Sequence, residues 1–254
     1  MTTSTHPQAT RASIQTMLGK ACNMDGFEGV ERFGNSDIII VTDPPFNVGY
    51  HYGKYNDRIP QTEYIERVSG LLKHPTIMVN TPENICQICA HTGMTPDRVV
   101  SWVYNTMNRR QHRDIAFFNI KPDMRLVRQP YKNPTDKRVR KRIENGSHGA
   151  AIYDWWNIQQ VKNVSREKTA HPCQMPLEVM LRTIGVIPKE FSEHIIVDPF
   201  CGSGTTLLAA QRFGYEFVGF DIDGEYVDIT NRRLVCDKGS GVNDGMRSTY
   251  VLQR

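Results

Sequence analysis

The turn Asp43-Pro44-Pro45-Phe46 is the first group of residues in this chain that could do chemistry. It follows the apolar run DIIIVT at residues 37–42, which predicts a buried strand, and its two prolines end that strand. The Asp43 carboxylate and the Pro44 carbonyl are therefore two acceptors on a rigid turn. Such acceptors can take the two hydrogens of an exocyclic amine on a nucleobase. The nitrogen lone pair is then localised for attack on a methyl donor.

Phe46 adds a flat ring at the end of the same turn. An aromatic face stacks on a base with roughly 1–3 kcal/mol. The base must leave the duplex to reach it, at a cost of a few kcal/mol. We therefore predict Asp43, Pro44, Pro45 and Phe46 as catalytic residues. On its own, however, such a turn is as readily explained as the plain end of a strand.

A second turn, DPFCGSGTT at residues 198–206, lies between the apolar run at 194–197 and a predicted helix. Its glycines permit a tight turn and a close approach of backbone to ligand, although glycines in a turn are often structural. The turn lacks the lysine of a nucleotide-phosphate loop and the third glycine of a dinucleotide fingerprint. Asp221, 19 residues after Gly202 at the end of the next predicted strand, is placed to bind ribose hydroxyls. This combination favours S-adenosylmethionine over NAD.

The positive charge of the chain is concentrated in its middle. Residues 121–168 hold 12 Lys and Arg against 5 Asp and Glu, whereas the net charge of the whole chain is only +4. Such a concentration is expected of a surface that meets phosphates, although a solvated loop would share it. We predict phosphate contacts, with one or two base contacts in the major groove, for Arg125, Arg128, Lys132, Lys137, Arg138, Arg140, Lys141 and Arg142.

Alternating strands and helices must position these residues. The sequence predicts strands at 37–42, 76–79, 99–103, 115–120, 194–197 and 216–220, and helices at 64–72, 175–186, 205–213 and 225–234. This alternation predicts an α/β fold with a mostly parallel sheet. The length of 254 residues fits one domain, 1–254, with 121–151 as an inserted segment. Residues 1–30 receive no role.

The composition is that of an ordinary globular protein, with 39% hydrophobic and 23% charged residues. We find neither an apolar run of about 18 residues nor a signal peptide, so we expect a cytoplasmic protein without a membrane partner. The six cysteines are expected to be reduced. Cys86 and Cys89 form a lone CxxC without further ligands nearby, which favours two small residues on a helix over a metal site. No metal is predicted.

With both turns identified, the chain resembles the β-class DNA amino-methyltransferases, which methylate adenine N6 or cytosine N4. The catalytic turn precedes the cofactor turn, with the basic segment between them. KTAHPCQMP at residues 168–176 resembles the family signature KTxHPTQKP. The resemblance covers about residues 36–235. Phe46 stands where tyrosine is commoner, Cys173 and Met175 replace threonine and lysine, and Asp221 replaces glutamate.

The resemblance implies a Rossmann-like, S-adenosylmethionine-dependent methyltransferase with residues 121–151 as the target-recognition segment. The cofactor would lie between the turns at 43–46 and 200–206, which must then face each other across one crevice. Its expected binding residues are Asp43, Thr169, His171, Asp198, Phe200, Gly202, Gly204, Thr206 and Asp221.

The expected reaction is site-specific methylation of adenine N6 in a base flipped out of double-stranded DNA, within a restriction–modification system. The aspartate at the start of the turn favours adenine, and cytosine N4 is the alternative. A non-catalytic DNA-binding protein on the same scaffold, or an RNA or protein substrate, would be further alternatives. The prediction also allows for a homodimer.

Overall fold

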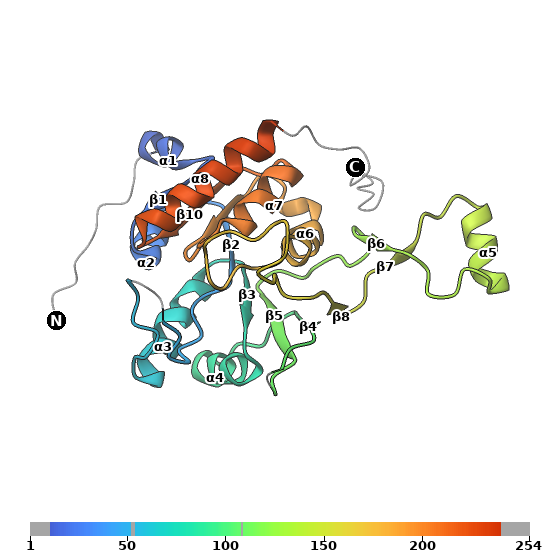
Figure 1. Ribbon diagram of the computed structural model, residues 1–254, viewed down its shortest axis with the longest axis horizontal. Coiled ribbons are helices and arrows are strands. Elements are labelled where there is room, and N and C mark those ends of the chain that lie inside the picture. Colours follow the sequence, from blue (N-terminus) through green and yellow to red (C-terminus); the bar gives the residue numbers. More distant parts are fainter. Residues whose placement is uncertain (1–10, 52–53, 108, 240–254) are drawn as a thin grey trace.

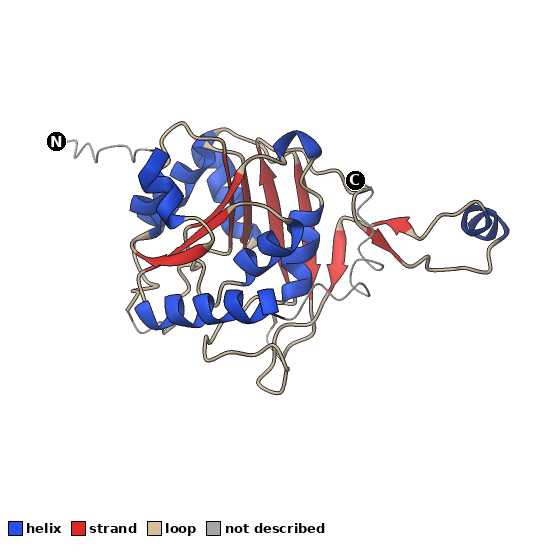
Figure 2. Ribbon diagram, turned by 90° about the horizontal axis from the view of Figure 1, so that it is seen from above, coloured by secondary structure: helices blue, strands red, loops and turns tan. Residues whose placement is uncertain are grey.

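A single large sheet organises the computed structural model, which describes residues 11–51, 54–107 and 109–239. Its eight strands are ordered β1-β10-β9-β2-β3-β5-β4-β8, and helices cover both faces (Figure 1; Figure 2). The strands are β1 (Lys20–Asn23), β2 (Ile38–Thr42), β3 (Thr76–Asn80), β4 (Arg98–Val103), β5 (His112–Phe118), β8 (Trp155–Asn157), β9 (Ile195–Asp198) and β10 (Phe217–Asp221).

The helices follow the strands in regular alternation over most of the chain. They are α1 (Arg11–Met17), α2 (Gly26–Glu31), α3 (Gln61–Ser69), α4 (Pro82–Thr92), α5 (Lys137–Glu144), α6 (Leu177–Gly185), α7 (Thr205–Phe213) and α8 (Gly224–Gly239), with 3-10 turns at Gly70–Lys73 and Lys189–Phe191. Five of the neighbouring strand pairs are parallel, and β5 runs antiparallel to both β3 and β4. The predicted α/β fold with a mostly parallel sheet is confirmed.

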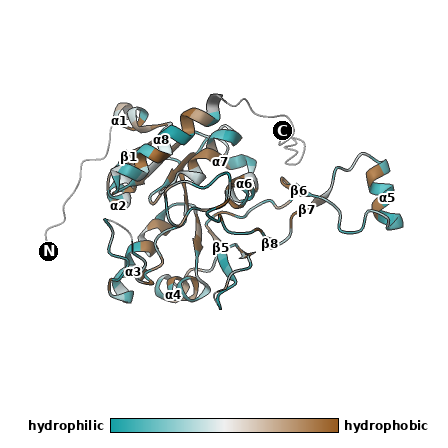
Figure 3. Cartoon of the chain, viewed as in Figure 1, coloured by the Kyte–Doolittle hydropathy of each residue, from teal (hydrophilic) through white to brown (hydrophobic). Residues whose placement is uncertain are grey.

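The central strands are buried on both faces. Every residue of β2 is buried, and its alternate side chains enter two different cores. Ile39 and Val41 belong to the core beneath α6 and α7, whereas Ile38 and Ile40 belong to the core beneath α3 and α4. Figure 3 shows the apolar strands inside and polar helix surfaces outside. A strand between two cores must be apolar throughout, which explains the continuous run in the sequence.

The order of the strands creates a crevice between β2 and β9. From β9 the chain crosses through α7 to β10 on one side, and from β2 it crosses through α3 to β3 on the other. β2 and β9 are parallel neighbours, with Ile40 opposite Val197. The two turns that follow them therefore emerge side by side at one edge of the sheet. Ligands of open α/β sheets bind at such a switch point.

The N-terminal region has a larger part in the fold than the sequence predicts. β1 pairs in parallel with β10 and extends the sheet, although no role is predicted for residues 1–30. Its sequence, KACN, has no apolar run because only Ala21 is buried. Pro176 differs from its prediction by one position, since it caps α6 instead of lying in the first turn. Cys86 and Cys89 lie on α4, which confirms the predicted helix there.

The inserted segment forms an arm that projects from the body (Figure 1; Figure 2). β6 (Arg128–Gln129) and β7 (Ala150–Ala151) pair as its stem, and α5 lies at its tip. The helix begins after Asp136, whose carboxylate accepts hydrogen bonds from the N–H groups of Arg138 and Val139. We do not predict this helix from the sequence, since none of its residues is buried. In the described part of the chain, no helix is long and apolar enough to span a membrane.

Candidate active site

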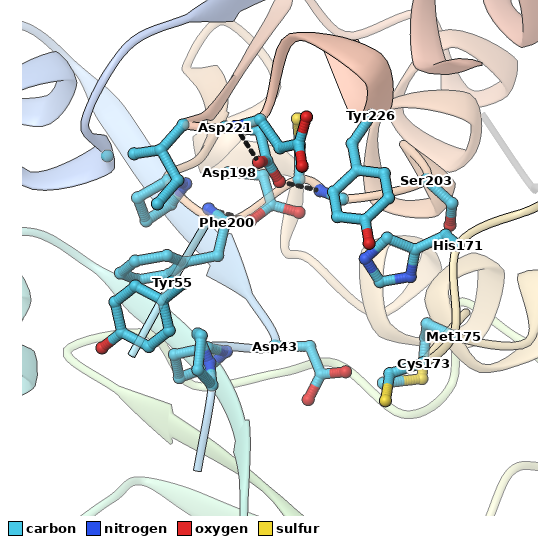
Figure 4. A pocket seen from close by; sticks show the side chains of 18 of the residues that line it. Asp43, Tyr55, His171, Cys173, Met175, Asp198, Phe200, Ser203, Asp221 and Tyr226 are labelled. Carbon is cyan, nitrogen blue, oxygen red and sulfur yellow. Dashed lines mark hydrogen bonds between the residues drawn. The ribbon is translucent and has the colours of Figure 1, made fainter. Parts of the chain in front are cut away.

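Both predicted turns line one cavity at the carboxyl ends of β2, β9 and β10. Figure 4 shows Asp43, Asp198, Phe200 and Asp221 around it, with His171 and Tyr226 on the opposite side. The expectation that residues 43–46 and 200–206 face each other across one crevice is confirmed. Of the predicted site residues, the cavity is lined by Asp43, Pro44, Pro45, Phe46, His171, Asp198, Phe200, Gly202, Thr206 and Asp221.

Asp43 lies in an environment that disfavours its charge. Its Oδ1 atom is buried and has no hydrogen-bond partner among the described residues. Burial raises the pKa of the carboxyl to about 7; the nearby Arg113 opposes this rise, and Asp198 adds to it. A buried polar atom without a partner costs free energy and is unusual unless a ligand completes it. The carboxylate is thus an acceptor that lacks a donor.

Side chains from the next loop and helix fix the turn in place. Asn84 of α4 donates from Nδ2 to the Phe46 carbonyl oxygen at 3.1 Å. The buried Asp57 carboxylate accepts the backbone N–H groups of Asn47, Val48 and Tyr50 at 2.8–3.2 Å. Asn47 adopts a left-handed φ of 59°. The turn is therefore rigid for reasons beyond its prolines, and the sequence gives no local signal for these long-range contacts.

Arg113 is a cavity residue that sequence reasoning missed. It lies in β5, and its guanidinium carbon is 4.3 Å from the centroid of the Phe46 ring. A stacked cation of this kind is stabilised by the negative face of the ring. The missed signal is the charged pair Arg113-Asp114 at the start of the apolar run IAFF.

The glycine turn is shaped by contacts within the protein itself. Gly202 and Gly204 have φ values of 47° and 77°, which favour glycine. A Cβ atom on Gly202 would lie 2.7 Å from His171 Nε2, and one on Gly204 would lie 2.4 Å from Thr230. The glycines are thus required by packing as well as by any ligand. Gly202 lines the cavity, whereas Gly204 and Thr169 lie behind its lining residues.

Asp198 connects the two turns. Its Oδ1 atom accepts hydrogen bonds from Thr42 Oγ1 at 2.9 Å and from the Phe200 N–H at 3.1 Å, and the Thr206 hydroxyl also bonds to the carboxylate. Thr42 immediately precedes the catalytic turn. Burial raises the pKa of Asp198 to about 6. Asp198 and Thr206 line the cavity, yet their polar groups are engaged with each other and with Thr42.

Asp221 presents a carboxylate at the end of β10. Its two oxygens accept the backbone N–H groups of Gly202 at 3.0 Å and Asp223 at 2.8 Å. Each oxygen keeps a second lone pair for a further donor such as a ribose hydroxyl. Burial raises the pKa of this carboxyl. Asp223 in turn pairs with Lys54 at 3.3 Å, across the mouth of the cavity.

His171 covers the cavity from the segment 168–174. Its ring stands edge-on to Tyr226 at 4.4 Å, and the Thr169 hydroxyl accepts the His171 N–H. Gln174 holds the base of the segment by accepting the Thr169 N–H at 2.8 Å. Burial, with the nearby Lys168 and Arg233 charges, lowers the pKa of His171 to about 4, so the ring is neutral near pH 7. Its Nδ1 atom is buried without a partner in the described chain.

The N-terminal helix α2 also reaches the cavity, through Asp25, Gly26 and Phe27. The Phe27 and Phe200 rings meet edge to face at 5.3 Å. A Cβ atom on Gly26 would lie only 1.9 Å from the Pro199 carbonyl oxygen, so α2 packs directly on the glycine turn. Sequence reasoning assigned nothing to this region, because its contribution depends on packing and not on a motif.

The predicted DNA-binding residues all lie in the arm or at its base, and none of them lines the cavity. The five basic residues of α5 are exposed. At the base, Arg125 pairs with Asp123 at 2.8 Å. Lys132 lies 4.8 Å from the Tyr153 ring centroid and 5.0 Å from that of Trp155. Within the described residues, no group of three His, Cys, Asp or Glu is arranged to hold a metal ion.

A family model described as DNA methylase, for N6 and N4 enzymes, matches residues 38–232. The chain belongs to the N6/N4 DNA methylase family. It is therefore a DNA methyltransferase, and S-adenosylmethionine is its cofactor. The family assignment explains why one cavity joins an amine-binding turn to an adenosine-binding turn, and it confirms the resemblance found in the sequence.

Known members of the N6/N4 DNA methylase family match most of the chain. DNA adenine methyltransferase YhdJ of Escherichia coli is 35% identical over 228 residues, which are 77% of this chain and 75% of that protein. Type II methyltransferase M.BglII of Bacillus subtilis is 26% identical over 273 residues, covering 87% and 74%. The structure of a DNA modification methylase from Thermus thermophilus, titled a complex with S-adenosyl-L-methionine, has a TM-score of 0.55 at 18% identity and covers 86% and 95%. This likeness shows a shared fold.

Proposed function

We propose that this methyltransferase acts on adenine N6 in double-stranded DNA, after the target base has left the duplex. The observation that supports this most directly is the buried Asp43 Oδ1 atom, an acceptor without a donor in the described structure. Asp43 would accept one hydrogen of the amine, and the Pro44 carbonyl oxygen would accept the other. The nitrogen lone pair then points out of the base plane as a nucleophile. Phe46 would stack on the base.

The chain's own residues fit the cofactor. We propose that Asp221 binds the ribose hydroxyls, that Phe200 and Gly202 contact the cofactor, and that His171 covers it. When bound, S-adenosylmethionine supplies a methyl group on a positively charged sulfonium. The cavity suits that charge, since acidic side chains line it from several elements. Asp198, Gly204, Thr169 and Thr206 would act mainly by holding the turn and the covering segment in shape.

The choice of adenine over cytosine has two supports. The catalytic turn begins with aspartate, the form that resembles adenine enzymes, and YhdJ is named a DNA adenine methyltransferase. Cytosine N4 offers the same amine to the same two acceptors, so it is the alternative outcome of the test.

We propose that the arm carries DNA recognition. Its helix exposes five basic residues against one Glu, a charge pattern that suits phosphate contacts. A restriction–modification setting is proposed from relatives such as M.BglII, which is named a type II methyltransferase. Action in the cytoplasm and assembly as a homodimer stay predictions, which cell fractionation and sedimentation would check.

Mass spectrometry of nucleosides tests the proposal. DNA is isolated from cells that lack endogenous adenine methylation and express either the wild type or Asp43→Ala. We expect N6-methyladenine with the wild type and none with the variant. N4-methylcytosine in its place would move the specificity to cytosine. Equal methylation by both proteins would contradict the role of Asp43.

A further inference from the structure

Arg113 occupies a position in β5 that would ordinarily be apolar. Residues 113, 115 and 117 of the strand share one face. Ile115 and Phe117 on that face are fully buried in the core beneath α6 and α7. A guanidinium beside such a core is costly unless it has partners. The partners of Arg113 are therefore a clue to its role.

Those partners belong to the catalytic turn. The guanidinium lies over the Phe46 ring at 4.3 Å, and Arg113 and Asp43 line the same cavity. The Arg113 Nε atom is buried and makes no hydrogen bond with any described residue, as is true of Asp43 Oδ1. An unpaired donor and an unpaired acceptor of opposite charge thus flank the ring on which the base is proposed to stack.

The charge balance around Asp43 depends on three elements. Arg113 comes from β5, Asp198 follows β9, and Tyr64 lies in α3. Among these, Asp198 repels a charged Asp43 and the neutral Tyr64 hydroxyl adds no positive charge. Arg113 is the group that favours the carboxylate, because an opposite charge stabilises the ionised form.

We propose that Arg113 is a positioning residue for methyl transfer, whose guanidinium both holds the Phe46 ring and balances the charge of the Asp43 carboxylate. This inference rests on the proposed role of Asp43 as the acceptor of an amine hydrogen. One side chain from a distant strand would then couple base stacking to the ionisation of the acceptor. Lysine can supply the charge but not the planar group, so the two contributions can be separated.

The experiment compares Arg113→Met, which removes the charge, with Arg113→Lys, which keeps it. Arg110→Met is the matched control, because Arg110 is three residues away and its guanidinium pairs with Glu83 at 2.7 Å. For each protein, kcat and the KM for DNA are measured from pH 5.5 to 9. Melting temperature and S-adenosylmethionine affinity establish that each variant is folded.

We expect Arg113→Met to lower kcat by about 10- to 100-fold near pH 7 and to move the acid limb of kcat upward by about one pH unit. Arg113→Lys should leave the acid limb near that of the wild type and raise the KM for DNA. Arg110→Met should behave as the wild type. An acid limb that Arg113→Met does not move would overturn the proposal. So would faster methylation by that variant, which would mean that the guanidinium merely obstructs the ring.

A measurement without turnover separates this inference from the proposed function. The change in melting temperature caused by Arg113→Met is compared in the wild type and in Asp43→Asn at pH 8. Coupling between the two charges predicts a smaller loss in the Asp43→Asn background. Equal losses would refute the charge balance even if the enzyme methylates adenine. Coupling without DNA methylation would refute the proposed function and leave the contact intact.

Discussion

The cavity and the arm are built on opposite physical principles. Around the cavity, charged groups are buried and held by fixed partners, as Asp57 and Asp198 are by backbone N–H groups. In the arm, the basic residues of α5 are exposed and packed against almost nothing. Methyl transfer needs preorganised geometry, whereas contact with phosphates needs mobile charge within reach of a long polymer. Variants in the two regions should therefore fail in different ways.

The largest expected effect is in the cavity. Asp43→Ala should lower the rate of methyl transfer by about 10³-fold or more, because it removes a fixed acceptor from the reacting amine. The affinities for S-adenosylmethionine and for DNA should stay close to those of the wild type. Rates from labelled methyl transfer and affinities from titration calorimetry check this. Near-normal turnover would remove Asp43 from the mechanism.

The arm should show the converse pattern. Reversing the charges of Lys137, Arg138, Arg140, Lys141 and Arg142 to glutamate should weaken DNA binding by about 10²-fold or more at moderate salt. The logarithmic salt dependence of binding should become shallower, since fewer counterions are released. Cofactor affinity should not change. If fluorescence anisotropy shows unaltered DNA binding, the DNA surface lies elsewhere on the protein.

Asp221→Ala should have a smaller effect, confined to the cofactor. Losing a carboxylate that accepts ribose hydroxyls should weaken S-adenosylmethionine binding by about 10-fold. Asp221→Asn serves as the conservative control, because it preserves the shape and one acceptor. A dissociation constant unchanged by Asp221→Ala would place the ribose at another residue.

The smallest effect concerns stability. The folded-state pKa of Asp43, about 7, lies above its ordinary value of 3.8, so folding is favoured when the carboxyl is protonated. That stability is present below pH 4 and is lost as the pH rises through 7. Asp43→Asn should therefore be more stable than the wild type by on the order of 1–3 kcal/mol at pH 8. The advantage should shrink towards pH 5 in urea titrations, and a variant less stable at pH 8 would contradict the burial argument.

The sequence predicted the elements that carry their own local signal. The helix α7 has the bounds predicted from residues 205–213, and β2 was identified from its β-branched run. The catalytic and glycine turns were identified because their residue types are uncommon in that order. The sequence did not predict features that arise from packing between distant segments. β1, Arg113 and Asp57 act through partners far away in the chain, and nothing in their neighbours in sequence marks them.

A crystal structure with S-adenosylhomocysteine and a DNA duplex would test the geometry of this site most directly. It should show the ribose against the Asp221 carboxylate, the sulfur facing the turn at 43–46, and an extruded adenine with its amine on Asp43. A cofactor bound outside the crevice between β2 and β9, or an adenine held away from Asp43, would contradict the account.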